Sequence, residues 1–166
     1  MAISGGQLNP AVSVALFITG KIDARKLLAF IISQFIGAVV AGLCLMWIFP
    51  QFVKADPYLG VPGLGANVSP WTAVGVEAIL TFLLVFSIFG TAIDPRAPKI
   101  GGFGIGLTVF FDILVGGPIT GAAMNPARHL GIALVTGHFV DTWVYWVGPL
   151  IGASLGAVIY DKLILE

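Results

Sequence analysis

Two short segments of the chain repeat each other and place the same polar residue types beside apolar ones. The segment 4–11 reads Ser-Gly-Gly-Gln-Leu-Asn-Pro-Ala, and the segment 120–127 reads Thr-Gly-Ala-Ala-Met-Asn-Pro-Ala, at an offset of 116 residues. Asparagine is a good N-cap, and proline is preorganised for the first position of a helix. Each triplet is therefore predicted to begin a helix; the triplets are Asn9, Pro10 and Ala11, and Asn125, Pro126 and Ala127.

The two predicted helix starts could control the passage of charge. The N-terminus of a helix carries about half a positive charge from its aligned peptide dipoles. Two such ends meeting inside a membrane would repel cations and protons and leave neutral solutes unaffected. The side-chain amides of Asn9 and Asn125 would remain as hydrogen-bond donors, and a water molecule that accepts from both cannot relay a proton.

The composition is that of a chain that lies in lipid. Of the 166 residues, 58% are hydrophobic and 10% are charged, and the mean hydropathy is +1.02. Soluble domains have about 25% charged residues, so this chain has too few polar side chains to cover a surface in water. The formal net charge is zero, which indicates no nucleic-acid partner, and the single Cys44 excludes multi-cysteine metal sites.

Uncharged stretches predict four membrane-spanning helices. Their expected bounds are 27–47, 70–92, 100–115 and 142–160. Two further apolar stretches, 9–19 and 125–136, have about half of the roughly 20 residues needed to cross the hydrocarbon. We expect these two either to be re-entrant half-helices or to lie flat on the membrane.

The basic residues predict the orientation. If the half-helices return to the side on which they start, one face carries Lys21, Arg25, Lys26, Arg96, Lys99 and Lys162. Lys54 alone lies on the other face, and Arg128 lies inside a re-entrant segment. The positive-inside rule makes the basic face cytoplasmic. We expect an integral, multi-pass protein of the cell membrane.

Each triplet is followed by a half-helix and then by a span, and the segment 35–38 matches 150–153. An odd number of spans separates the copies, which predicts an inverted repeat. We divide the single domain 1–166 into a first repeat, 1–53, and a second repeat, 69–166. Two spans precede the second triplet and none precedes the first, so we expect the first repeat to lack two spans. Either the chain is a fragment or its start is placed too late.

Paired Asn-Pro-Ala half-helices, Arg128 directly after the second and the inverted repeat resemble the aquaporin, or major intrinsic protein, family. The match extends from Ser4 to about Leu165. The resemblance implies an all-α membrane fold, here with four transmembrane helices and two re-entrant half-helices. It also implies a passive channel that forms a homotetramer and needs no cofactor, metal or catalytic residue. Meeting helix ends are the accepted charge barrier of aquaporin-type pores.

The resemblance further implies a selectivity filter near the extracellular side. Arg128 matches its arginine, Ala122 and Ile113 match two more positions, and the fourth belongs to a missing span. Isoleucine with alanine makes an apolar filter similar to that of the plant tonoplast intrinsic group, which passes water and often ammonia or other small neutral solutes. The glycerol facilitators are the nearest rival; Ala133 and Tyr145 favour a water channel, and His129 fits neither pattern.

The resemblance implies that Glu77 accepts backbone N–H groups from the second re-entrant segment. We expect Asp112 to be a buried carboxylate with its hydrogen bonds satisfied, and His129 to be packed or hydrogen-bonded behind the pore. Gly148, Gly152 and Gly156 form a stripe of small residues, which favours a close contact between helices.

Two other functions remain open. An ion-coupled secondary transporter can also use inverted repeats and broken helices, but it would need carboxylates beside the triplets, and only Asp112 is near. A truncated chain that conducts nothing is the other possibility.

Overall fold

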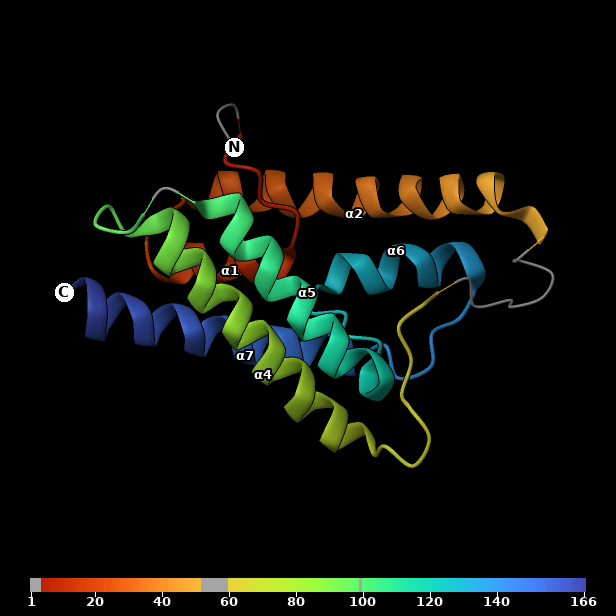
Figure 1. Cartoon of the computed structure of the whole chain (residues 1–166). Helices are drawn as coiled ribbons and strands as arrows, with labels where there is room; N and C mark the ends of the chain where they lie inside the picture. Colours follow the sequence, from red (N-terminus) through yellow and green to blue (C-terminus); the bar gives the residue numbers. More distant parts are fainter. Residues whose placement is uncertain (1–3, 52–59, 99) are drawn as a thin grey trace.

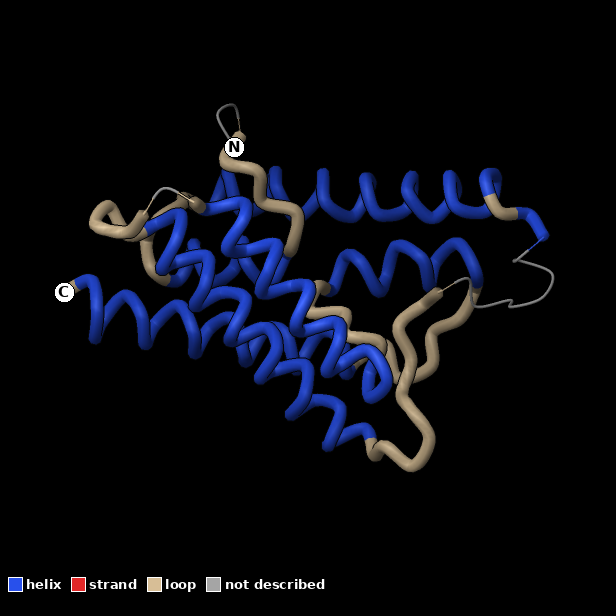
Figure 2. The backbone as a smooth tube through the Cα atoms, viewed as in Figure 1, coloured by secondary structure: helices blue, strands red, loops and turns tan. Residues whose placement is uncertain are grey.

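The computed structural model describes residues 4–51, 60–98 and 100–166. Two of the lysines used to predict the orientation, Lys54 and Lys99, lie outside these ranges. All regular structure within the described residues is helical, as Figure 2 shows. The predicted all-α fold is therefore confirmed.

Six helices and two π-helical turns make up the regular structure of the described residues, and Figure 1 shows their arrangement. The helices are α1 (Pro10–Ile18), α2 (Ala24–Ile48), α4 (Pro70–Ile88), α5 (Gly101–Thr120), α6 (Pro126–Thr136) and α7 (Val144–Tyr160). The π-helical turns η1 (Phe89–Ile93) and η2 (Asp161–Leu165) extend α4 and α7. Four of these segments are long and apolar enough to cross a membrane: Ala24–Ile48, Pro70–Ile93, Gly101–Thr120 and Val144–Leu165. The predicted number of four spans is confirmed.

Two predicted span ends differ from the structure. The third span continues five residues past 115, through Pro118, to the end of α5 at Thr120. This helix is capped by Gly121, whose φ of 78° allows the left-handed C-cap that glycine favours. The fourth span continues past Tyr160 through η2, which the sequence pattern did not indicate.

The two short helices extend in opposite directions from the middle of the bundle (Figure 1). With 9 and 11 residues, α1 and α6 are too short to cross. Each packs against the span that follows the other: α1 lies on α7, and α6 lies on α2. This crossed packing relates the two halves of the chain and places both short helices inside the bundle.

The largest helix contact is the seam between α4 and α7, and the predicted glycine stripe forms it. A Cβ atom at Gly148 would lie 2.8 Å from the carbonyl oxygen of Val74, and one at Gly152 would overlap the carbonyl of Ala78. Because these glycines have no side chains, the backbone of α7 can approach that of α4. The expected close helix contact is confirmed.

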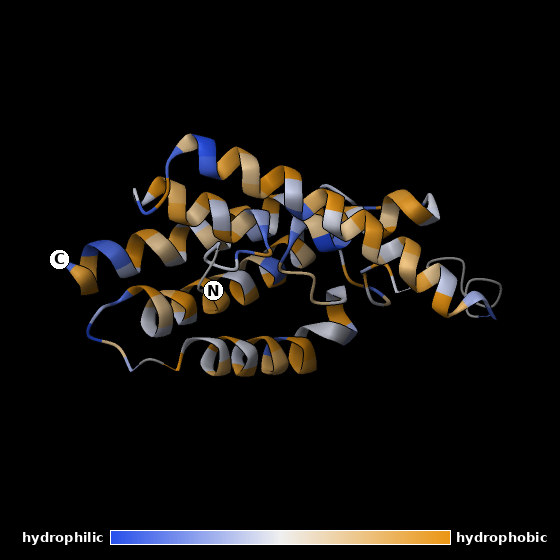
Figure 3. Ribbon diagram, turned by 90° about the horizontal axis from the view of Figure 1, so that it is seen from above, coloured by the Kyte–Doolittle hydropathy of each residue, from blue (hydrophilic) through white to orange (hydrophobic). Residues whose placement is uncertain are grey.

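The other two long helices, α2 and α5, are much more exposed than α4 and α7. Only 11% of the most apolar stretch of α2 or α5 is buried, against 44% for α4 and α7. Figure 3 shows mainly apolar residues along the long helices. At Gly37, which matches Gly152 in the repeat, an added Cβ would meet no described atom within 4 Å. On α7, the face with Gly152 is covered by α4. No described element covers the equivalent face of α2 at Gly37.

An ion pair within the connection after α4 is hydrogen-bonded to the end of α7. Arg96 donates from Nε to Asp94 Oδ1 at 2.9 Å and from Nη2 to Oδ2 at 2.8 Å, and the Tyr160 hydroxyl donates to Oδ2 at 3.2 Å. The hydrogen bonds from Arg96 hold the pKa of Asp94 well below its usual range. This cluster fixes the ends of the two helices that share the glycine seam.

The seam predicts opposite effects of the same substitution on two helices. Gly152→Ala should lower the free energy of unfolding by about 1–3 kcal/mol, because the methyl group overlaps the backbone of α4. Gly75→Ala on α4 has no atom within 4 Å of the added Cβ and should be neutral or raise it by up to about 1 kcal/mol. Denaturation in detergent, followed by tryptophan fluorescence, measures both; equal effects would contradict the seam.

Candidate functional site

Both Asn-Pro-Ala triplets begin helices in the way that their residue types predict. Asn9 and Asn125 have extended backbones, with φ of −146° and −155°, and proline occupies the first helical turn after each. The Oδ1 atom of Asn9 accepts from the Ala11 N–H at 2.9 Å. The Oδ1 atom of Asn125 accepts from Ala127 N at 3.0 Å and from Arg128 N at 3.2 Å. Each asparagine therefore caps its own half-helix.

The same two asparagines tie the half-helices to each other. The Nδ2 atom of Asn9 donates to the carbonyl of Met124 at 2.6 Å, and that of Asn125 donates to the carbonyl of Leu8 at 3.0 Å. The structure thus brings the two triplets together, N-terminus to N-terminus. An amide nitrogen carries two N–H groups, so this exchange uses one and leaves one on each side chain.

A buried carboxylate holds the second re-entrant segment. Glu77 on α4 is fully buried, and its Oε1 accepts from Thr120 Oγ1 at 2.6 Å and from Ala123 N at 2.9 Å. Its Oε2 accepts from Met124 N at 2.7 Å. These two backbone contacts are those that the sequence led us to expect of Glu77. They fix the backbone immediately before Asn125.

The backbone that Glu77 holds is strained. Ala122 and Met124 have φ of 45° and 52°, a left-handed conformation that costs a non-glycine residue roughly 1–2 kcal/mol. In the first segment the positions equivalent to Gly121 and Ala122 are Gly5 and Gly6, with φ of 92° and 66°. The two segments therefore share a left-handed turn, which the second maintains at Ala122 without glycine.

The first re-entrant segment is held by side chains that sequence reasoning missed. Gln34 on α2 donates from Nε2 to the carbonyl of Gln7 at 3.1 Å and to Ser13 Oγ at 2.9 Å. The Ser13 hydroxyl in turn donates to Gln7 Oε1 at 2.8 Å. A glutamine in the middle of an uncharged span was the available signal, because a buried amide requires partners.

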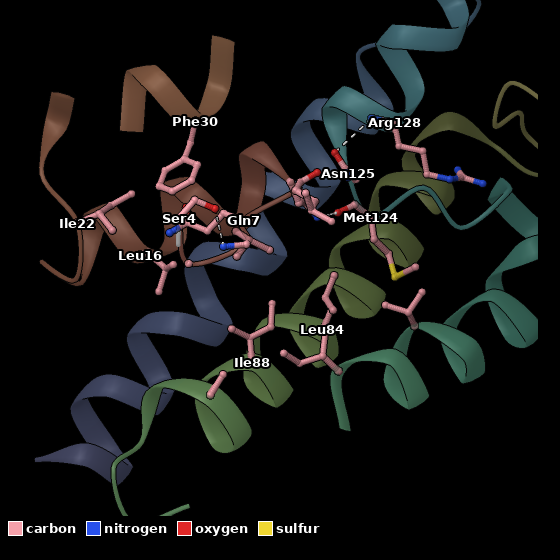
Figure 4. A pocket seen from close by; sticks show the side chains of 18 of the residues that line it. Ser4, Gln7, Leu16, Ile22, Phe30, Leu84, Ile88, Met124, Asn125 and Arg128 are labelled. Carbon is pink, nitrogen blue, oxygen red and sulfur yellow. Dashed lines mark hydrogen bonds between the residues drawn. The ribbon is translucent and has the colours of Figure 1, made fainter. Parts of the chain in front are cut away.

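A cavity of about 1100 Å³ runs past both triplets. Asn9 and Asn125 line it, and so do all three residues assigned to a filter: Ile113, Ala122 and Arg128. Figure 4 shows Asn125 and Arg128 at one end and Ile22 and Phe30 at the other. The remaining triplet residues lie behind the wall, where all four are buried: Pro10, Ala11, Pro126 and Ala127.

The wall of the cavity carries no acidic side chain within the described residues. Asp112, next to Ile113, is 4% exposed and is not part of the wall. Its Oδ2 has no hydrogen-bond partner among the described residues, so the expectation of a satisfied carboxylate is wrong for this part of the chain. Asp112 lies on the same face of α5 as Gly116 and Thr120, and this face packs against α4. The sequence could not show that α4 provides no hydrogen-bond donor for Asp112 Oδ2.

The ring of His129 is fully buried behind the wall, as expected. It stacks on Tyr145 with ring centroids 4.1 Å apart, and its Nε2 lies 3.1 Å from Thr142 Oγ1. The Tyr145 hydroxyl donates to the carbonyl of Thr120 at 2.8 Å, a contact with the second re-entrant segment that sequence reasoning also missed. A tyrosine in an apolar span was its only signal.

Comparisons with known proteins agree with this geometry. The sequence model of the family described as "Major intrinsic protein" matches residues 1–160. The chain is 44% identical to "Aquaporin TIP4-4" of Zea mays and 40% identical to "Probable aquaporin TIP1-2" of Oryza sativa subsp. japonica, and each match covers 98% of this chain. It spans 64% of the length of each of these relatives.

A solved structure also matches. The X-ray structure of the aquaglyceroporin from Plasmodium falciparum is 25% identical and superposes with a TM-score of 0.89. The superposition covers 96% of this chain and 73% of that chain. The arrangement of four spans and two half-helices is therefore shared with a known membrane protein.

The Glu77 contacts predict a graded loss of stability. Glu77→Gln removes a charged acceptor of three hydrogen bonds, each worth about 1.5–3 kcal/mol, and should lower the free energy of unfolding by several kcal/mol. Thr120→Val removes one of the three, together with the acceptor of the Ala122 N–H, and should cost a smaller amount, about 2–3 kcal/mol. Denaturation in detergent measures both variants; a Glu77→Gln protein as stable as Thr120→Val would show that the carboxylate does not hold the segment.

Proposed function

Because the chain belongs to the major intrinsic protein family, we propose that it forms a passive transmembrane channel for water and small neutral solutes. The observation that carries the proposal is the reciprocal contact of Asn9 with Met124 and of Asn125 with Leu8, in the wall of a single cavity. The relatives are named aquaporins, which are channels and not enzymes.

The meeting helix ends supply the barrier to ions. Each N-terminus contributes about half a positive charge, and both point at the same stretch of the cavity. The N–H groups left on Asn9 and Asn125 would hold the oxygen of a passing water molecule, which then cannot accept a proton from its neighbour. A neutral solute has no net charge, so the two half-charges do not repel it.

The choice among neutral solutes would rest with Ile113, Ala122 and Arg128. The guanidinium of Arg128 offers hydrogen-bond donors and repels cations, while Ile113 and Ala122 add apolar wall. An apolar, wide filter favours ammonia beside water, with glycerol or urea as larger candidates. The same charge on Arg128 reinforces the barrier at the triplets.

Two further spans would complete the pore. The second repeat, 69–166, has two spans before its triplet, whereas the first, 1–53, has none. The uncovered apolar face of α2 and the 64% coverage of the relatives support this division of the domain 1–166. We propose that the complete protein is a homotetramer with one pore in each subunit.

The protein is an integral, multi-pass membrane protein, by its family and its four apolar helices. We propose that the face with Lys21, Arg25 and Lys26 is cytoplasmic. The TIP-type relatives favour the tonoplast over the cell membrane that the sequence analysis indicates. An ion-coupled transporter is disfavoured, because no acidic residue of the described chain lines the cavity.

The proposal predicts how the filter arginine acts. In lipid vesicles, the natively expressed protein should raise osmotic water permeability over that of empty vesicles without raising proton permeability. Arg128→Ala should admit glycerol faster and leak protons, because it removes a bulky donor and a positive charge. Arg25→Ala removes an exposed arginine at the start of α2 and should match the unsubstituted protein.

Stopped-flow light scattering measures water and glycerol, and a pH-sensitive dye measures protons. A protein that passes no water above the background would reject the channel and leave a non-conducting chain. Equal solute ratios for Arg128→Ala and Arg25→Ala would instead reject only the filter assignment. Transport that stops when the proton gradient is collapsed would favour the coupled transporter.

The helix-end barrier predicts the effect of charge at a triplet. Asn125→Asp keeps an oxygen that can cap Ala127 and Arg128, but it removes the donor to Leu8 and adds a negative charge. Proton and cation leak should rise while the protein still inserts and passes water. Asn67→Asp, an equal change in the connection before α4, should leave the leak unchanged; a leak in both variants would show that position is irrelevant.

A further inference from the structure

The end of α5 is fixed by hydrogen-bond donors from two other parts of the chain. The last carbonyl groups of an α-helix have no donors within the helix and need partners elsewhere. The carbonyl of Thr120 accepts from the Tyr145 hydroxyl on α7. The carbonyl of Ile119 accepts from Gly65 N at 2.8 Å, and Gly65 belongs to the connection 60–69 that precedes α4. The second re-entrant segment begins directly after these two bonds.

The connection 60–69 reaches the end of α5 because Gly65 has no side chain. A Cβ atom at Gly65 would overlap the carbonyl oxygen of Pro118 and would lie 3.3 Å from that of Ile119. Figure 1 shows this connection, in yellow, passing the end of α5 before it enters α4. Both of the atoms that a methyl group would meet belong to the backbone, so no side-chain rotation can make room for it.

Other residues of the connection hold it against the same turn. Pro62 is buried, and a Cβ atom at Gly121 would lie 2.8 Å from the Cα of Pro62. Leu64 and Val68 pack on a buried cluster that includes Ala123 and residues of α4 and α7. The connection therefore follows the backbone of the re-entrant segment over several residues.

The turn that the connection contacts carries one of the three filter residues. Ala122 has φ of 45°, a conformation that alanine keeps only when its surroundings impose it. Its N–H donates to Thr120 Oγ1 at 3.2 Å, and its Cβ would lie 3.2 Å from a Cβ at Gly116 of α5. Gly116 is less than one helical turn from Ile113, another filter residue. A displacement of the turn therefore changes the opening between Ala122 and Ile113.

We propose that Gly65 is a positioning residue for the selectivity filter: its bare backbone lets the connection 60–69 hold the turn 119–122, and with it Ala122, at the wall of the cavity. This inference rests on the proposed channel function. Glu77 binds the same segment nearer the second triplet, at Ala123 and Met124. Loosening the connection should therefore change which neutral solutes pass while the triplets still exclude protons.

The test compares Gly65→Ala with Gly63→Ala in vesicles that contain the natively expressed protein. Gly63 is an exposed glycine of the same connection, and a Cβ there would meet no atom closer than 4.0 Å. In Gly65→Ala the methyl group separates the two backbones and breaks the bond to Ile119. The ratio of glycerol to water permeability should rise by about 5-fold, the equivalent of one hydrogen bond, without a rise in proton permeability. In Gly63→Ala the ratio should equal that of the unsubstituted protein.

The permeability ratio separates a role in positioning from a general loss of folded protein. A smaller folded fraction lowers both permeabilities by the same factor and leaves their ratio unchanged. An unchanged ratio in Gly65→Ala, or equal changes in Gly65→Ala and Gly63→Ala, would overturn the proposal. A proton leak that rises together with the glycerol permeability would also overturn it, because the substitution would then act on the triplets as well.

A second variant covers the case in which Gly65→Ala does not accumulate. Leu64→Ala removes apolar contacts of the connection with the buried cluster and leaves the backbone of Gly65 free of any added atom. It should raise the ratio of glycerol to water permeability in the same direction by a smaller factor. No rise in Leu64→Ala would overturn the proposal.

Amide hydrogen exchange tests the contact without conduction. In NMR spectra of the protein in detergent, the Gly65 N–H should exchange about 10-fold or more slowly than that of Gly63, which is exposed and donates to no described residue. Equal exchange rates would overturn the proposal. A protein that passes no water would reject the channel function, and the exchange rates would still decide whether Gly65 holds the turn.

Discussion

Two helix N-termini of like partial charge face each other in the middle of this bundle, and the rest of the structure serves to hold them there. Their mutual repulsion has to be opposed by direct bonds. Each asparagine supplies two kinds of bond at once, a cap for its own helix and a donor to the carbonyl that precedes the other triplet. The crossed packing of α1 on α7 and of α6 on α2 then resists separation of the pair.

The two re-entrant segments reach the same geometry through different chemistry. Glu77 binds backbone N–H groups of the second segment, whereas Gln34 binds a backbone carbonyl and a hydroxyl of the first. A carboxylate can only accept and an amide nitrogen can only donate, so each support is matched to the backbone groups that point toward it. The stronger, charged support occurs where the left-handed turn includes Ala122 rather than glycine.

Local features of the fold were predictable, and partners distant in sequence were not. The caps at Asn9 and Asn125 depend on residues within one helical turn, so the Asn-Pro pattern predicts them. The glycine stripe on α7 was equally visible, because its spacing lies within one helix. Three other features depend on which element lies opposite a side chain, and hydropathy does not contain that information. They are the hydrogen bond from Tyr145 to Thr120, the lack of a donor for Asp112 and the hydrogen bonds of Gln34. The end of α5 was misplaced for a local reason, since Gly116, Gly117 and Pro118 look like a helix stop, whereas the left-handed residue is Gly121.

Barrier and selectivity depend on separate parts of the same wall in the proposed channel. The barrier arises from peptide dipoles, which every sequence that forms the two half-helices possesses, and from two asparagine amides. The filter depends on the side chains at Ile113, Ala122 and Arg128, which contribute nothing to the caps or to the exchange between the triplets. Substitutions at Ile113 or Ala122 can therefore change which neutral solute passes while the exclusion of protons is retained. Arg128 alone belongs to both, because its backbone N–H completes the cap of α6, its side chain lines the cavity, and the charge of that side chain reinforces the barrier.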